Sequence, residues 1–178
     1  MTTPAPLQDA PKPDSPRWRS LAPVLLLAAV VVSTAAVAGR FFTWNLSPSM
    51  PRGLYVLERG KVPERCSIVL VPVPDSVRPT ALGRGYLPAG AKLLKVVVAL
   101  PGDAACIRDG SLIVNGDVLG PVLSRDSRGR PLAPARFCGH LPAGAAFVAT
   151  PASLSFDSRY FGPVPLSALT VVRPLWTF

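Results

Sequence analysis

The hydrophobic and polar positions divide the chain into three parts. Residues 1–20 hold five prolines and show no apolar periodicity, which predicts a disordered N-terminal tail. Residues 21–39 are nineteen positions without a charge, and a helix of that length approaches the roughly 30 Å of bilayer hydrocarbon. This run therefore predicts a single transmembrane helix. Residues 40–178 follow it as one outer domain.

The apolar run has a second interpretation, because Ala36-Val37-Ala38 is a small-residue pattern typical of a secretory cleavage site. The run is longer than the core of about 7 to 15 residues usual for such signals, which favours an uncleaved anchor. Three basic residues precede the run and two follow it closely, a slim excess that favours a cytoplasmic N-terminus. We therefore expect a single-pass protein of the cytoplasmic (inner) membrane, with the outer domain on its periplasmic side.

The outer domain reads as strands. Its apolar or β-branched runs are short and end at Pro, Gly or Asp, as strands do. Asp109-Gly110 and Asn115-Gly116 are dipeptides typical of type I′ turns, so they predict a tight meander. We expect a mainly β domain, an antiparallel sheet of the closed or half-closed kind. The predicted strands are 67–73, 91–100, 105–108, 112–114, 118–119, 145–149 and 169–172.

Composition and charge exclude several function classes. The formal net charge is +9, but the basic residues are scattered singly and no aromatic residues alternate with them, so we predict no nucleic-acid partner. Attraction to an anionic membrane surface and a simply solvated face both remain open. Cys138 and His140 are too few for a metal site, and the sequence has no phosphate-binding loop, so we expect no metal and no cofactor.

Two segments carry hydroxyl or charged groups suited to chemistry. Just after the apolar run, Ser47 and Ser49 alternate with prolines in SPSMP, which fixes an extended loop. Taken alone, this is an ordinary Ser-Pro turn. Later, Ser155, Asp157 and Arg159 lie on one side of an extended segment, where a salt-bridged turn is an equal possibility.

A third candidate is Lys95, inside the apolar run LLKVVVALPGD. Burial of its ammonium would be costly and would lower its pKa, which makes a general base. From the strand alone, a lysine on the solvent face of a half-exposed strand is the simpler interpretation.

Together the three segments resemble a known family. NLSPSMPRGLY, KVVVALPGD and SFDSRYFGPV, in this order after an apolar run, resemble the type I signal peptidases, and more closely the TraF-type conjugative transfer signal peptidases. The similarity covers nearly all of residues 40–172. It implies a signal-peptidase-like β domain, a membrane-anchored serine endopeptidase activity, and a polypeptide precursor and membrane lipid as partners.

The resemblance also implies roles for single residues. Ser49 matches the nucleophile and Lys95 the general base of a Ser-Lys dyad. Ser47 matches the residue whose hydroxyl contributes to the oxyanion hole, with the backbone N–H of Ser49. Ser155 matches the hydroxyl that orients the lysine. Asp157 and Arg159 match the pair that holds the site together.

Paired cysteines occur in TraF-like proteins, and by this resemblance Cys106 and Cys138 are candidates for a disulfide that leaves Cys66 free; three separate thiols are the alternative. The chain departs from the family where many members read Lys-Arg and GDN, because it has Lys95-Val96 and Ala149-Thr150-Pro151. Both departures favour the TraF-like branch.

Three functions remain to be separated. The first is a peptidase that processes a secreted or conjugative pilin precursor, with an amine of the same substrate able to replace water and cyclise the product. The second is a general signal peptidase that cleaves exported preproteins. The third is an inactive assembly partner of a secretion apparatus. A Ser-His-Asp triad through His140 has little support, because no spacing links that residue to Ser49 or Asp157.

Overall fold

The structure is a computed structural model that describes residues 18–178. The chain divides into two compact units, residues 1–40 and residues 41–178. The predicted tail, residues 1–20, lies almost entirely outside the described residues.

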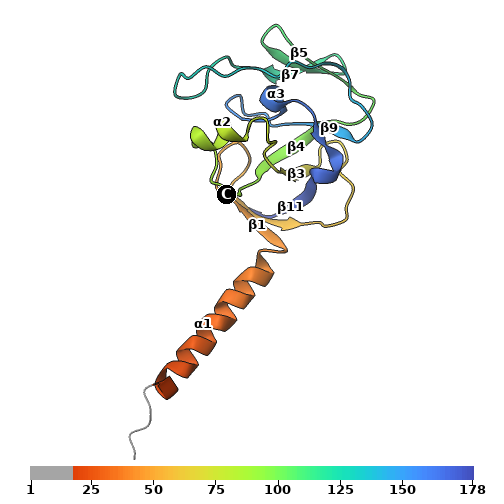
Figure 1. Ribbon diagram of the computed structural model, residues 1–178. Coiled ribbons are helices and arrows are strands. Elements are labelled where there is room, and N and C mark those ends of the chain that lie inside the picture. Colours follow the sequence, from red (N-terminus) through yellow and green to blue (C-terminus); the bar gives the residue numbers. More distant parts are fainter. Residues whose placement is uncertain (1–17) are drawn as a thin grey trace, which may run out of the picture. The chain divides into compact units, whose positions relative to one another are not determined.

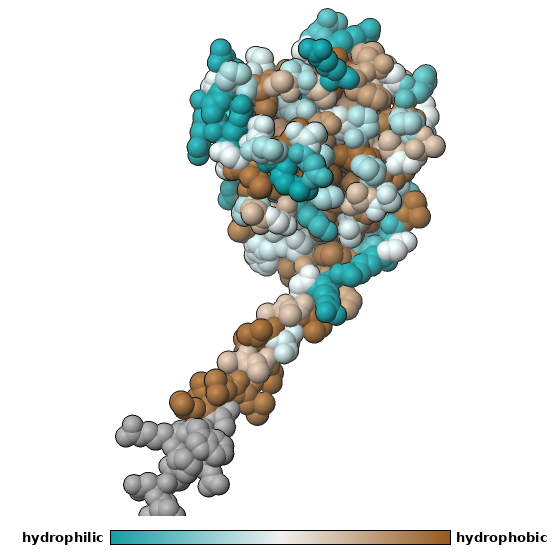
Figure 2. Space-filling model, in the orientation of Figure 1, coloured by the Kyte–Doolittle hydropathy of each residue, from teal (hydrophilic) through white to brown (hydrophobic). Residues whose placement is uncertain are grey.

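The first unit contains helix α1, Trp18–Ala38. Its apolar side chains are exposed, and Figure 2 shows hydrophobic residues along the described part of the helix. Pro23 lies near the helix start, where its missing N–H does little harm. Among residues 18–178, no helix combines the length and hydropathy needed to cross a membrane. The predicted transmembrane anchor at 21–39 is therefore not confirmed.

The second unit is mainly β and antiparallel, as the sequence predicts. Its larger sheet has seven strands in the order β1-β2-β11-β3-β4-β9-β10, all joined by antiparallel pairing. The bounds are β1 Phe42–Asn45, β2 Gly53–Leu57, β3 Ile68–Val71, β4 Leu93–Ala99, β9 Ala145–Ala149, β10 Val164–Pro165 and β11 Thr170–Thr177. Short helices stand between strands: α2 Arg78–Gly83, α3 Ser158–Phe161 and the 3-10 turn η1 Leu166–Ala168.

The smaller sheet has four strands in the order β7-β6-β5-β8. They are β5 Ala104–Arg108, β6 Ser111–Val114, β7 Asp117–Pro121 and β8 Cys138–His140. In Figure 1, β5 and β7 lie at the end of the domain opposite to β1 and β11. Asp109-Gly110 and Asn115-Gly116 all have positive φ, which confirms the predicted tight turns of the meander.

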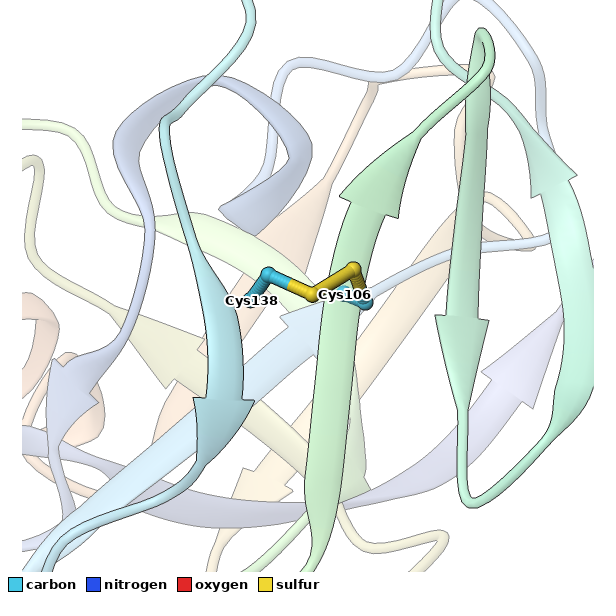
Figure 3. Close-up of a disulfide and its surroundings, with 2 residues drawn as sticks. All are labelled: Cys106 and Cys138. Atoms are coloured by element: carbon cyan, nitrogen blue, oxygen red, sulfur yellow. A yellow bond between two sulfur atoms is a disulfide. The ribbon is translucent and has the colours of Figure 1, made fainter.

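A disulfide crosses the smaller sheet. Cys106 on β5 and Cys138 on β8 are directly opposite in the ladder, and their sulfurs are bonded (Figure 3). The bridge spans 32 positions of sequence. Cys66 is free and exposed.

Strand β11 connects the β1–β2 hairpin with the rest of the larger sheet. Its first residues, Thr170 and Val171, pair with β3, whereas Val172 and the following residues pair with β2. The β1–β2 hairpin is thereby attached to the central strands β3 and β4. Gly53 at the start of β2 is required there, because its φ is positive and an added Cβ would clash with the carbonyl oxygen of Trp176.

Candidate active site

The loop between β1 and β2 carries the two serines of the first motif, and Asn45 shapes it. The Asn45 side chain is buried, with 8% of its surface exposed. Its Nδ2 lies 3.1 Å from the Ser47 carbonyl oxygen, 3.1 Å from that of Met50 and 3.0 Å from that of Pro51. Since three carbonyl oxygens of one loop lie around the same side-chain nitrogen, which has two N–H groups, the loop is folded around Asn45.

The acceptor atom of Asn45 holds Ser47. Oδ1 accepts a hydrogen bond from the Ser47 backbone N–H at 3.1 Å and another from its hydroxyl at 3.0 Å. A hydroxyl has one proton to donate, so Ser47 Oγ acts as an acceptor toward Ser49 Oγ, 3.2 Å away. The two serines that alternate in the sequence therefore lie side by side.

Two residues anchor the loop to the sheet. Met50 is 9% exposed and packs in one apolar cluster with Tyr55, Leu70, Leu94 and Val172. The Tyr55 hydroxyl donates to the carbonyl oxygen of Pro51 at 2.7 Å. Burial raises the pKa of Tyr55, so the phenol stays protonated and able to donate. Because Leu94 precedes Lys95 on β4, the packing of Met50 brings its neighbour Ser49 to the lysine.

Lys95 is buried in the middle of β4, with 3% of its surface exposed. The interpretation as a solvent-facing lysine is therefore wrong. Val69 of β3 lies directly opposite it, and Leu93 and Val97 share its face of β4 by strand alternation. Its Nζ donates to Ser49 Oγ at 3.3 Å, and this is the hydrogen bond that links the first two motifs.

The surroundings of Lys95 favour its neutral form. Burial lowers its pKa from 10.5 to about 8, the nearby Asp157 carboxylate opposes this change, and the Arg159 guanidinium adds to it. A substantial share of the lysine is therefore an uncharged amine at mildly alkaline pH, which is the state that accepts a proton.

Asp157 and Arg159 form a buried ion pair at the start of α3. Arg159 Nη2 lies 2.7 Å and its Nε 2.8 Å from the two carboxylate oxygens, with side-chain exposures of 2% and 0%. Asp157 also caps α3 by accepting from the Arg159 backbone N–H. Burial alone would lower the pKa of Arg159, but the hydrogen bonds and charge of Asp157 outweigh it and raise that pKa. The guanidinium further donates to the carbonyl oxygens of Pro121, Thr150 and Ala152.

Ser155 is buried, but its predicted contact with the lysine is not seen. Its exposure is 3%, and among the described residues its Oγ has no hydrogen-bond partner. The Thr150 Oγ1 is in the same situation, at 6% exposure. The segment between β9 and α3 thus holds two buried hydroxyls without partners.

His140 takes no part in this arrangement. It is exposed on β8, where its Nδ1 lies 2.9 Å from the Gly102 carbonyl oxygen. Within residues 18–178, no group of three or more His, Cys, Asp or Glu side chains could hold a metal ion.

Asn45 is the residue that sequence reasoning missed. It is the first residue of the motif NLSPSMPRGLY, in which the resemblance assigns roles to the two serines alone. An Asn placed just before a Pro-rich loop can satisfy backbone groups that a strand or helix would otherwise pair, and this tendency was the available signal.

Comparisons with known proteins identify the family of this chain. Residues 17–174 match the family described as signal peptidase, peptidase S26. The conjugal transfer protein TraF of Agrobacterium fabrum (strain C58) is 36% identical over 173 residues, which are 90% of this chain and 97% of that protein. The plasmid transfer protein TraF of Escherichia coli is 32% identical over 169 residues, 88% of this chain and 91% of that protein.

A crystal structure of a signal peptidase I from Enterococcus faecalis V583 is 27% identical, covers 64% of this chain and 97% of its own, and has a TM-score of 0.39. Because the family match spans most of the sequence and the relatives are about a third identical over nearly their whole length, the chain belongs to the signal peptidase family, peptidase S26, and to its TraF type.

Proposed function

We propose that this chain is a serine endopeptidase in which Ser49 is the nucleophile and Lys95 the general base. One observation carries the proposal: a buried lysine with a pKa lowered to about 8 lies 3.3 Å from the serine hydroxyl. A Ser-Lys dyad needs both this proximity and an uncharged amine. Membership of the peptidase S26 family supports the same reaction class.

The proposed reaction is acyl transfer in two steps. Ser49 Oγ attacks the carbonyl carbon of a peptide bond while Lys95 Nζ takes the hydroxyl proton. As the tetrahedral intermediate collapses, Lys95 gives that proton to the leaving amine nitrogen and the C–N bond breaks. Water then attacks the Ser49 ester with Lys95 again as base, which releases the acid and restores the serine.

The oxyanion of each intermediate requires donors. We propose the backbone N–H of Ser49 and the hydroxyl of Ser47, the second of which donates to Asn45 Oδ1 in the substrate-free chain. Rotation of the Ser47 hydroxyl from the amide oxygen to the developing oxyanion supplies a charge-assisted hydrogen bond when the intermediate forms.

For the substrate, we propose a secreted or conjugative pilin precursor. This rests on the relatives that are named conjugal or plasmid transfer proteins. An amine of the same substrate could then take the place of water and yield a cyclic product. A general preprotein specificity is the alternative, and the two differ in substrate alone.

We further propose that the chain works at the periplasmic side of the cytoplasmic membrane. Exposed aromatic side chains cluster on the strands next to the serine loop: the Trp44 and Trp176 rings are 6.0 Å apart and the Trp176 and Phe178 rings 5.1 Å apart. Aromatic residues favour the membrane interface. The apolar residues 21–39 remain the candidate anchor, and alkaline extraction of membranes that contain the full chain tests this: release into the soluble fraction contradicts it.

The function is tested by co-expressing a candidate pilin precursor with the full chain in membranes and measuring products by intact mass. Ser49→Ala and Lys95→Ala should each abolish the cleaved product. Ser76→Ala and Lys92→Ala change exposed residues of the same types and should leave it unchanged. A product one water lighter than the linear form indicates cyclisation.

Processing that survives Ser49→Ala contradicts the proposed nucleophile. If the wild-type chain cleaves neither the pilin nor ordinary preproteins, the peptidase proposal fails and the inactive assembly partner becomes the better description.

A further inference from the structure

Within residues 18–178, Lys95 has N–H donors without acceptors, and two buried hydroxyls in the segment after β9 have no hydrogen-bond partner. A lysine ammonium has three N–H donors, and among the described residues only Ser49 Oγ accepts from it. In the segment that follows β9, Thr150 Oγ1 and Ser155 Oγ are buried without partners. Buried polar groups are nearly always hydrogen-bonded, so two such hydroxyls in one short segment require an explanation. The resemblance assigns Ser155 to the lysine, but it assigns no role to Thr150.

Extension of the strand register by one position beyond the end of β9 brings Thr150 beside Lys95. In the antiparallel ladder of β4 and β9, Val97 lies opposite Val148 and Val96 opposite Ala149. Strand β9 ends at Ala149, and one further step along the same register would put Thr150 opposite Lys95. Residues directly opposite in such a ladder project from the same face, with Cβ atoms about 4.5–5.5 Å apart. The opposite neighbour on β3 is Val69, which has no polar side-chain group.

The backbone of Thr150 is also fixed by the ion pair. Its carbonyl oxygen accepts from Arg159 Nη2 at 3.3 Å, and Arg159 is held by Asp157. The Thr150 hydroxyl is therefore held in place through Arg159, independently of Ser155.

On the basis of the proposed Ser-Lys function, we propose that Thr150 is a positioning residue for Lys95. In the described part of the substrate-free chain the Thr150 hydroxyl is without a partner, and in the reacting enzyme it would accept a hydrogen bond from the lysine nitrogen. A neutral amine has two N–H groups and one lone pair in a tetrahedral arrangement. When Thr150 and Ser155 accept from the two N–H groups, the lone pair is left to face the Ser49 hydroxyl, which is the orientation that proton transfer needs.

The expected pH effect follows from which form of the lysine binds more strongly. The charged groups that act on Lys95 are Asp157, which raises its pKa, and Arg159, which lowers it. A hydroxyl accepts more strongly from an ammonium than from an amine, so the Thr150 contact favours the charged form. Its removal should lower the pKa of Lys95 further.

The test compares Thr150→Val, which keeps the shape and removes the hydroxyl, with Thr150→Ser, which retains it. Steady-state cleavage by the full chain in detergent is measured from pH 6 to pH 10, about two units either side of the Lys95 pKa, which is about 8. We expect Thr150→Val to lower kcat about tenfold and to move the alkaline rise of activity to lower pH. Thr150→Ser should restore both.

Ser158→Ala is the matched control. The Ser158 hydroxyl is buried and accepts from the Val148 backbone N–H on β9 at 3.0 Å, so its loss should lower Tm without moving the pH profile. If Thr150→Val has the wild-type kcat and profile, or if Ser158→Ala moves the profile equally, the positioning role is wrong.

The proposed Ser-Lys function on which this inference rests is tested separately. Retained cleavage by Ser49→Ala or Lys95→Ala overturns the dyad itself. If Thr150→Val does not fold, the comparison of Thr150→Ser with Thr150→Ala decides the matter, since equal profiles for these two variants overturn the proposal.

Discussion

Asn45 Oδ1 accepts both the backbone N–H and the hydroxyl of Ser47, at 3.1 and 3.0 Å. One amide thus fixes the backbone of the proposed oxyanion donor and the direction of its proton, while its Nδ2 faces three carbonyl oxygens of the same loop. Asn45 is therefore a positioning residue for both serines.

Asn45→Ala should lower kcat/KM by one to two orders of magnitude, because the loss of buried hydrogen bonds costs about 1–3 kcal/mol and the loop carries Ser49. Asn45→Asp keeps the acceptor but removes the donors, so it should also be impaired. Kinetics of precursor cleavage measure this. Asn115→Ala, in a turn of the smaller sheet, should lower Tm and leave the kinetics of the folded enzyme unchanged. Wild-type kinetics for Asn45→Ala would contradict the positioning role of Asn45.

Activity should depend on the protonation of Lys95. With a pKa of about 8, the lysine is mostly charged at pH 6 and mostly neutral at pH 9. Below pH 8, kcat/KM should therefore fall about tenfold for each pH unit, because only the amine accepts the Ser49 proton. A profile measured with the full chain that is flat between pH 6 and pH 8 contradicts this assignment.

The same pKa has a consequence for stability. The folded-state value of about 8 is below the unfolded value of 10.5, so folding stability rises with pH between these limits as the folded lysine loses its proton first. Below pH 8 the buried charge costs about 3 kcal/mol. Lys95→Met should thus raise the free energy of unfolding at pH 7, with a benefit that shrinks toward pH 10.5. Chemical denaturation at several pH values measures it, and a pH-independent difference would be inconsistent with a charge effect.

The buried pair of Asp157 and Arg159 should be essential for folding. Asp157→Ala leaves a buried guanidinium without its partner, and such changes cost about 3–5 kcal/mol. Glu58→Ala removes the partner of Lys61 and Arg173, surface contacts of 2.9 and 3.5 Å that water screens, and should change Tm very little. Thermal unfolding of both variants tests the contrast, and equal Tm values would contradict it.

The disulfide should contribute stability without contributing to chemistry. A bridge across 32 positions restricts the unfolded chain and is worth about 4 kcal/mol in the chain-entropy model. The double variant Cys106→Ser, Cys138→Ser should unfold at a lower temperature yet cleave normally while folded. The bridge lies in the smaller sheet, whereas Ser49 lies in a loop between two strands of the larger sheet. Cys66→Ser changes a free, exposed thiol and should alter neither property.

Sequence patterns predicted the central strands β3 and β4 well, but only the first part of β11, the longest strand. Apolar runs such as 67–73 and 91–100 correspond to β3 and β4 with ends shifted inward. The patterns missed β1 and β2, which flank a Pro-rich loop, and the two-residue strand β10. They also missed β8, whose three exposed residues form a strand only because β5 pairs with them. Local propensity does not contain such tertiary pairing.

For the site, residue types and order identified the candidates, but not their environments. Alternation alone left Lys95 solvent-facing, because a single strand does not reveal what covers it. Its burial arises from Val69 on β3 and from the Met50 loop, both distant in sequence. Likewise, the role of Asn45 depends on a loop that closes around it, which no spacing rule describes.

The proposed nucleophile and base come from distant parts of the chain, a hairpin at one edge of the sheet and a strand in its centre, 46 positions apart. Met50 must pack into the apolar cluster that contains Tyr55 and Leu94 before the two groups meet. A newly made or partly unfolded chain would therefore be inactive. Competence to cut other polypeptides would arise only with completed folding, which protects the chain from damaging itself or its neighbours while it is still being made.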